Sequence, residues 1–84
     1  MEPAVAFGRA LRKRRLDASM TQEELAFEAG LARVYISWIE TGRKQPTFRT
    51  MIKLAYALGC FASELVGEAE ALLNESTASE SAEG

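Results

Sequence analysis

The stretch Thr21–Glu40, TQEELAFEAGLARVYISWIE, predicts two short helices joined by a tight turn. Thr21 and Glu24 have the T-x-x-E spacing of a capping box, in which two free backbone N–H groups at a helix start are satisfied reciprocally. Gly30 suits the turn, because glycine reaches positive φ without a Cβ penalty. Apolar residues recur on one face of each segment: Leu25, Ala26 and Ala29, then Ile36 and Ile39. We therefore expect one helix to start at Thr21 and a second to cover residues 33–41.

Apolar periodicity predicts three more helices outside this stretch. The first covers about residues 3–17 and interleaves apolar with basic side chains; Pro3 suits a first helical turn. The second covers about residues 48–58, with Thr47 as its cap and Gly59 as its stop. The third covers about residues 62–73. Strand-like alternation is absent from the sequence, so the expected fold is all-α with five helices.

Composition excludes several classes of function. The 84 residues suit one small domain, and they include no histidine and one cysteine, so neither an internal disulfide nor a zinc site is expected. No apolar run approaches about 18 residues, so no membrane span is expected. The N-terminal order of apolar and basic residues is the reverse of that in a secretory signal, which predicts a cytoplasmic protein. Without a phosphate-cradling glycine loop or clustered carboxylates, an enzyme is not expected, and neither a cofactor nor a small-molecule ligand is evident.

Charge is distributed unevenly along the chain. The net charge is −2, but all ten Lys and Arg residues lie between Arg9 and Lys53. Residues 1–60 therefore carry a formal charge of +4 and residues 61–84 one of −6. A basic portion of this kind favours a polyanionic partner, although a solvated surface with an acidic tail has the same composition. We expect a folded domain over residues 1–74 and a disordered acidic tail over residues 75–84.

The spacing of the Thr21–Glu40 stretch is that of a helix-turn-helix, whose second helix enters a DNA major groove. From about Phe7 to Leu65, the chain resembles the xenobiotic-response-element, or Cro/CI-type, helix-turn-helix family. TQEELA, the Gly30 turn, ISWIETGRKQP and KLAYALG fall at the expected separations. Short members include controller proteins of restriction–modification systems, and phage-type repressors share the core. The resemblance implies a lambda-repressor-like domain, with the motif at its second and third helices, that regulates transcription by binding double-stranded DNA.

The same resemblance implies roles for individual residues. The expected phosphate contacts come from Gln22, Arg43, Lys44 and Thr47. The expected base-reading positions are Arg33, Val34 and Trp38, flanked by Tyr35 and Ser37. Trp38 is bulky for such a position, so it either addresses DNA or folds over the domain. Arg15 and Glu40 match an internal ion pair, whereas Ser19 replaces a frequent glycine, and Ala32 and Phe61 replace the usual Ser or Thr caps.

One domain of this size should bind DNA weakly, which favours a homodimer on an inverted repeat with half-sites about 34 Å apart. The expected dimer interface is the apolar stripe of the last helix: Leu65, Val66, Ala69, Leu72 and Leu73. Alternatively, this stripe packs only on the first helix. The second functional hypothesis is a protein-interaction module of the same fold, anchored by Tyr35 and Trp38. The operator, and activation versus repression, are not specified by the sequence.

Overall fold

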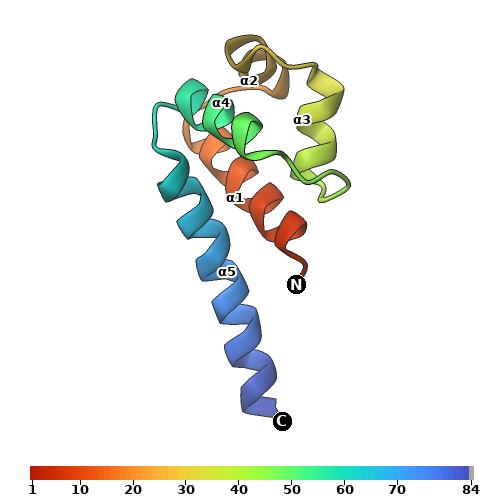
Figure 1. The fold of residues 1–84 in the computed structure, drawn as a ribbon, viewed down its shortest axis with the longest axis vertical. Helices are drawn as coiled ribbons and strands as arrows, with labels where there is room; N and C mark the ends of the chain where they lie inside the picture. Colours follow the sequence, from red (N-terminus) through yellow and green to blue (C-terminus); the bar gives the residue numbers. More distant parts are fainter. Residues whose placement is uncertain (84) are drawn as a thin grey trace.

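The computed structural model describes the backbone of residues 1–83 and the side chains of residues 1–76. Over this range, the chain forms five helices and no strand (Figure 1). The helices are α1 (Pro3–Asp17), α2 (Gln22–Ala29), α3 (Arg33–Glu40), α4 (Phe48–Leu58) and α5 (Ala62–Glu83). The all-α prediction is confirmed, and the bounds of α1 to α4 agree with the predicted ones to within one residue.

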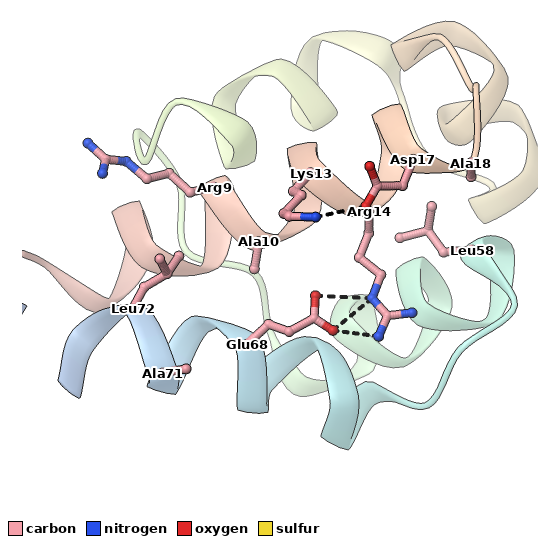
Figure 2. Close-up of a pocket in the computed structure, with 10 residues that line it drawn as sticks. All are labelled: Arg9, Ala10, Lys13, Arg14, Asp17, Ala18, Leu58, Glu68, Ala71 and Leu72. Atoms are coloured by element: carbon pink, nitrogen blue, oxygen red, sulfur yellow. Dashed lines mark hydrogen bonds and ion pairs between the residues drawn. The ribbon is translucent and has the colours of Figure 1, made fainter. Parts of the chain in front are cut away.

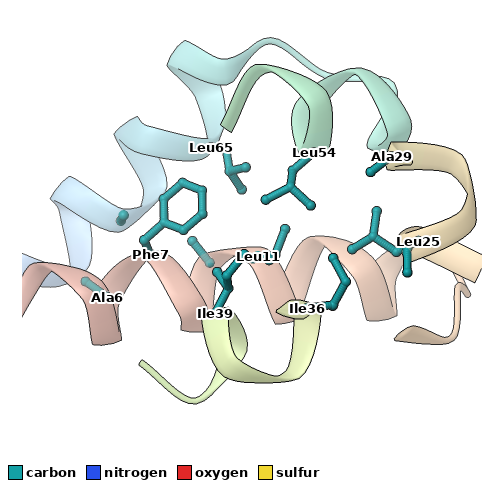
Figure 3. Packing of buried hydrophobic residues seen from close by; sticks show 12 residues of the cluster. Ala6, Phe7, Leu11, Leu25, Ala29, Ile36, Ile39, Leu54 and Leu65 are labelled. Atoms are coloured by element: carbon teal, nitrogen blue, oxygen red, sulfur yellow. The ribbon is translucent and has the colours of Figure 1, made fainter. Parts of the chain in front are cut away.

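The hydrophobic core draws on every helix. Its six largest fully buried side chains are Leu11, Leu25, Ile36, Ile39, Leu54 and Leu65 (Figure 3). Burial of each contributes roughly 1.5–3 kcal/mol to folding. Because α1 packs against α3, and α4 packs against α2, these two helices hold the α2–α3 pair from behind, and α5 packs in turn on α1 and α4. The motif is thus part of the core rather than an appendage to it.

Glycine at position 8 lets α1 approach α3 closely. A Cβ built on Gly8 would lie 2.3 Å from the carbonyl oxygen of Ile39 and 2.8 Å from that of Glu40. Both are backbone atoms of α3, which no rotamer change could move away. The crossing of α1 and α3 therefore requires the absence of a side chain at this position.

The backbone conformation of the α1–α2 turn at Ser19 is one that favours glycine, the residue that the family resembled by this chain often has there. Ser19 has φ 57°, a left-handed conformation that a non-glycine residue adopts only at a cost in free energy. Its N–H donates to the carbonyl oxygen of Leu16 at 3.0 Å, which helps to end α1. The sequence thus tolerates a strained residue just before the motif begins.

The last helix is longer than predicted. α5 continues to Glu83 rather than ending near residue 73, whereas Gly84 lies outside the described residues and the disordered tail over residues 75–84 stays a prediction. No glycine or proline interrupts the chain between Gly67 and Gly84, and the helix-favouring residues Ala and Glu recur there. A helix already started on the core therefore continues through a polar segment. Figure 1 shows α5 extending well beyond the body of the domain.

Hydropathy gives one result over the described residues. No single helix among them is both long and apolar enough to cross a membrane. α4 and Ala62–Ser76 reach the necessary length and hydropathy only when they are taken together, and the chain bends by 105° at the break between them.

Replacing Gly8 with alanine should lower the free energy of unfolding by about 1–3 kcal/mol, because the new methyl group forces α1 away from α3. Urea denaturation followed by circular dichroism measures this loss. Gly67→Ala is the matched control, since Gly67 lies within α5 with nothing within 4 Å of its Cβ position. That substitution should raise stability by about 0.5–1 kcal/mol. Equal effects of the two substitutions would contradict the close crossing.

Candidate nucleic-acid interface

Local interactions determine the α2–turn–α3 geometry. The Thr21 hydroxyl accepts a hydrogen bond from the Glu24 N–H at 3.0 Å, and the Glu24 carboxylate accepts one from the Thr21 N–H at 3.0 Å. The bond from the Thr21 backbone, followed by that from its side chain, lowers the pKa of Glu24. Gly30 ends α2 with φ 68°, and the Leu31 N–H donates to the Ala26 carbonyl at 2.8 Å. The predicted capping box and glycine turn are confirmed.

The two sides of α3 differ sharply in exposure. Ile36 and Ile39 are fully buried and fix the rotation of the helix against the core. Arg33 and Val34 are exposed at its first turn, and Ser37 is half-buried one turn later. Tyr35 packs partly against the core. The first turn of α3 therefore presents a long cation beside a short apolar side chain to the outside.

Trp38 connects α3 to the loop that follows it. Its carbonyl accepts hydrogen bonds from the N–H groups of Arg43 at 2.8 Å and Lys44 at 3.2 Å. The Lys44 ammonium lies 5.9 Å from the centroid of the Trp38 ring, within cation–π range. Trp38 is 36% exposed, so its side chain is partly buried but still contributes to the surface. The indole therefore helps to place Lys44 beside α3.

A chain of hydrogen bonds leads from the core to the exposed end of α3. Arg15 donates from Nε to Glu40 Oε2 at 2.6 Å, from Nη2 to Glu40 Oε1 at 3.0 Å, and from Nη1 to the Met20 carbonyl at 2.8 Å. Gln22 Nε2 donates to Glu40 Oε1 at 3.1 Å. Arg33 Nη1 in turn donates to Gln22 Oε1 at 3.4 Å. The predicted Arg15–Glu40 ion pair is present, and it extends into a four-residue network.

Burial makes this network structurally important. Arg15 and Glu40 are both buried, and the hydrogen bond with Glu40 raises the pKa of the Arg15 guanidinium despite the opposing effect of desolvation. No buried side-chain N or O atom among the described residues lacks a partner, so the charges are fully compensated. Since Arg15 lies on α1, Gln22 on α2 and Glu40 on α3, the network holds three helices in one arrangement.

The loop between α3 and α4 carries two exposed cations, Arg43 and Lys44. Gly42 begins this loop with φ 78°, and a Cβ there would lie 2.7 Å from Val5 Cγ2 of α1. At its end, Thr47 Oγ1 accepts the Thr50 N–H at 3.2 Å and so caps α4. The cations therefore lie between the end of α3 and the positive end of the α4 dipole, an arrangement suited to phosphate.

A sequence model described as Helix-turn-helix matches residues 11–65 of this chain. The chain belongs to the helix-turn-helix family. Members of this family are DNA-binding transcription regulators, which are not enzymes. The control protein C.BamHI of Bacillus amyloliquefaciens is 43% identical over 61 residues, which are 71% of this chain and 75% of that protein.

Solved structures agree with this assignment. The restriction–modification controller protein C.AhdI from Aeromonas hydrophila is 39% identical, with a TM-score of 0.73 over 74% of this chain and 94% of that one. The controller protein C.Esp1396I, solved as a tetramer in complex with its natural 35-base-pair operator, is 29% identical. Its TM-score is 0.72, and the match covers 82% of this chain and 96% of that one.

In this helix-turn-helix protein, two of the residues predicted for a dimer interface lie in the core of one chain. Leu65 is fully buried and Ala69 is buried, so neither is available to a second copy, and that part of the prediction is wrong. The physical reason is that α5 packs against α1, so the core of one chain already covers this part of the stripe. Leu72 and Leu73 also pack partly against this core, and only Val66 is well exposed.

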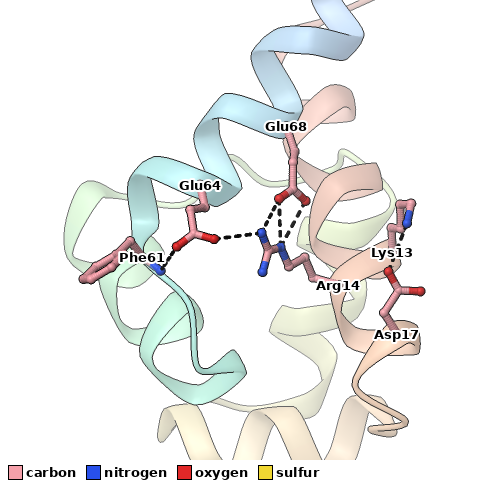
Figure 4. Close-up of polar contacts among 6 residues, drawn as sticks. All are labelled: Lys13, Arg14, Asp17, Phe61, Glu64 and Glu68. Atoms are coloured by element: carbon pink, nitrogen blue, oxygen red, sulfur yellow. Dashed lines mark hydrogen bonds and ion pairs between the residues drawn. The ribbon is translucent and has the colours of Figure 1, made fainter.

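An ion-pair cluster that the sequence analysis missed ties α5 to α1. Arg14 donates from Nε to Glu68 Oε2 at 2.9 Å and from Nη2 to Glu64 Oε2 at 3.2 Å (Figure 4). The hydrogen bond with Glu68 is the main cause of the raised pKa of Arg14. The signal was the i, i+4 spacing of Glu64 and Glu68, but the cation lies about fifty residues earlier and only the fold pairs them.

A groove of about 750 Å³ runs between α1 and α5 beside this cluster (Figure 2). Its lining includes Arg9 and Lys13 of α1, and Lys13 is paired with Asp17 at 3.0 Å. Among the described residues, no group of three His, Cys, Asp or Glu side chains could hold a metal ion. The charged groups that line the groove mostly neutralise one another, so the α3 surface is the better candidate for a functional site.

Replacing Glu40 with alanine should lower the free energy of unfolding by about 3–5 kcal/mol, because Arg15 would remain buried without its carboxylate. Urea denaturation at neutral pH measures this change. Lys13→Ala is the control, since it breaks the exposed Lys13–Asp17 pair and should change stability by no more than about 1 kcal/mol. If Glu40→Ala costs no more than Lys13→Ala, the buried network does not hold the helices together.

Proposed function

We propose that this protein is a sequence-specific transcriptional regulator that binds an inverted-repeat operator as a homodimer, with α3 in the major groove. The observation that carries the proposal is the first turn of α3. There Arg33 and Val34 face outward above the buried network, while Arg43 and Lys44 lie in the loop after the helix. Family membership and the operator complex of the relative C.Esp1396I support the same conclusion.

Phosphate contacts would fix the protein on the duplex. The amide of Gln22 lies at the N-terminus of α2, and Arg43 and Lys44 lie near the N-terminus of α4. Helix N-termini and cationic side chains are the usual partners of DNA phosphates, and they position a protein without reading sequence. Thr47 lies at the same helix start, where its hydroxyl already caps α4. These groups would give affinity that falls with salt.

Base contacts would supply specificity. A guanidinium suits the O6 and N7 acceptors of guanine, and such a pair discriminates by about 1–3 kcal/mol. The hydrogen bond from Arg33 to Gln22 limits the freedom of the Arg33 side chain before DNA arrives, which reduces the entropy lost on binding. Val34 would contact a thymine methyl group, and Ser37 and Trp38 would flank this pair on the same helix.

The alternative, a protein-interaction module anchored by Tyr35 and Trp38, has weaker support. Both side chains are partly buried in their own domain, so they offer little free surface to a protein partner.

Two-fold symmetry suits the DNA-binding role, because a dimer doubles the phosphate and base contacts of one small domain. Such a regulator would act in the cytoplasm.

Arg33→Ala should relax sequence specificity by about 1–3 kcal/mol at one position of each half-site, because a bidentate base contact is lost. Lys44→Ala should weaken binding to all sequences about equally and reduce the slope of log affinity against log salt by about 1, because one phosphate contact is lost. Mobility-shift titrations on operator and random duplexes at several salt concentrations measure both.

Arg9→Ala is the matched control, because it removes the same charge from the groove between α1 and α5. It should leave specificity unchanged. Undiminished binding and specificity in both Arg33→Ala and Lys44→Ala would overturn the proposed readout.

A further inference from the structure

The groove of about 750 Å³ between α1 and α5 has an apolar floor that the core does not fill (Figure 2). Alanine and leucine side chains form this floor: Ala10, Ala18, Leu58, Ala71 and Leu72. Three of the five are alanines, so little side-chain volume occupies the space between the two helices. The volume lies within the range of about 300–1,000 Å³ that is usual for small-molecule sites.

The ion pairs around the groove leave one of its charges without a partner. Lys13 is paired with Asp17 at 3.0 Å, and Arg14 is paired with Glu68. Arg9 is exposed, and among the described side chains it has no acidic partner. It lies at the opposite end of the groove from Arg14 (Figure 2). The groove therefore combines an apolar floor with one free positive charge at its Arg9 end.

A second guanidinium group lies close to this end. Arg12 lines an adjoining hollow together with Arg9, and within residues 1–76 it too has no acidic partner. Like charges this close on a helix repel each other. An anion bound between them would relieve that repulsion, and guanidinium groups suit carboxylates because they can donate two parallel hydrogen bonds.

We propose that this groove binds a small anionic amphiphile, namely a carboxylate with an unbranched acyl chain of medium length. The carboxylate would bind at the Arg9 end, and the acyl chain would lie along the floor toward Leu58. From Arg9 to Ala18, α1 spans roughly 13 Å, which gives room for a chain of this kind. An uncharged or cationic amphiphile would lack the contact with Arg9, so the charge of the ligand determines the affinity.

The groove lies on a different side of α1 from the proposed DNA-binding surface. Within the described part of the chain, no residue of α2, of α3 or of the loop between α3 and α4 lines it. Figure 1 shows α1 between α3 and α5, and α1 packs against both. This site therefore does not rest on the proposed function. Arg33→Ala, which tests the base contact, should leave ligand binding unchanged.

The probe is octanoate, titrated into the ¹⁵N-labelled full chain and followed by the chemical shifts of the backbone amides. The shifts should saturate with a dissociation constant of about 1 mM or below, as expected for a ligand of about ten non-hydrogen atoms. They should be largest at Ala10, Ala71 and Leu72. Octylamine has the same chain with the opposite charge, so it should bind at least about tenfold more weakly.

Three variants test the assignment of the site. Arg9→Ala should raise the dissociation constant of octanoate about fivefold, because an exposed charge contact is lost. Lys53→Ala is the matched control, since it removes an exposed cation from α4 outside the groove, and it should leave that constant unchanged. Ala71→Trp should abolish saturable binding, because the indole fills the floor. Ala71 is exposed, so helical content by circular dichroism should be unchanged in this variant.

Three results would overturn the inference: no saturable shifts, equal affinity for octanoate and octylamine, or normal octanoate binding by Ala71→Trp. Shifts centred on the separate hollow lined by Phe7 and Met51 would also contradict it. Binding to phosphatidylglycerol vesicles that octanoate does not compete for would assign the two free guanidinium groups to a membrane surface and would refute the groove. None of these results bears on the proposed DNA readout, which the Arg33→Ala and Lys44→Ala titrations test separately.

Discussion

The buried ion pair between Arg15 and Glu40 is the constraint on which the functional surface depends. Its two charges lie in the core, so they persist only while α1 and α3 keep the geometry that pairs them. The Glu40 carboxylate also accepts a hydrogen bond from the Gln22 amide, and Gln22 in turn accepts one from the Arg33 guanidinium. The orientation of an exposed side chain at the first turn of α3 is therefore set by an interaction beneath it. A recognition surface built in this way is ordered before DNA arrives, which reduces the entropic cost of binding.

Local chemistry made most of the fold predictable. The Thr21 capping box, the Gly30 turn, the Thr47 cap and the Gly59 stop act within a few residues, and each occurs where the sequence predicts it. The end of α5 was mispredicted because the polar composition was weighed more heavily than the absence of glycine and proline between Gly67 and Gly84. Whether a second copy or the first helix covers Leu65 and Ala69 was left open by the sequence, since an apolar stripe does not reveal which neighbour covers it. Burial against α1 is a property of the whole fold.

The candidate site likewise has features that the sequence predicts and features that only the structure shows. Its residue types and spacing were visible in the sequence, because they lie on one short helix and the loop after it. The contacts that orient them were not all visible: the cation–π contact of Lys44 with Trp38 and the hydrogen bond of Arg33 with Gln22 need coordinates. Residues that break a local rule are also informative. Ser19 has a positive φ just after α1, and Phe61 stands at 75% exposure where a capping Ser or Thr is usual, so each departs from the local preference at a helix junction.

The central claim is that α3 reads a specific sequence from a two-fold related pair of domains. Selection of bound duplexes from a random DNA pool by the full chain tests it most directly, because one experiment reports binding, symmetry and spacing. The account predicts enrichment of an inverted repeat whose half-sites lie about one helical turn, roughly 34 Å, apart and contain a guanine for Arg33. A pool with no enriched motif, or with a single unrepeated half-site from a dimeric protein, would contradict it.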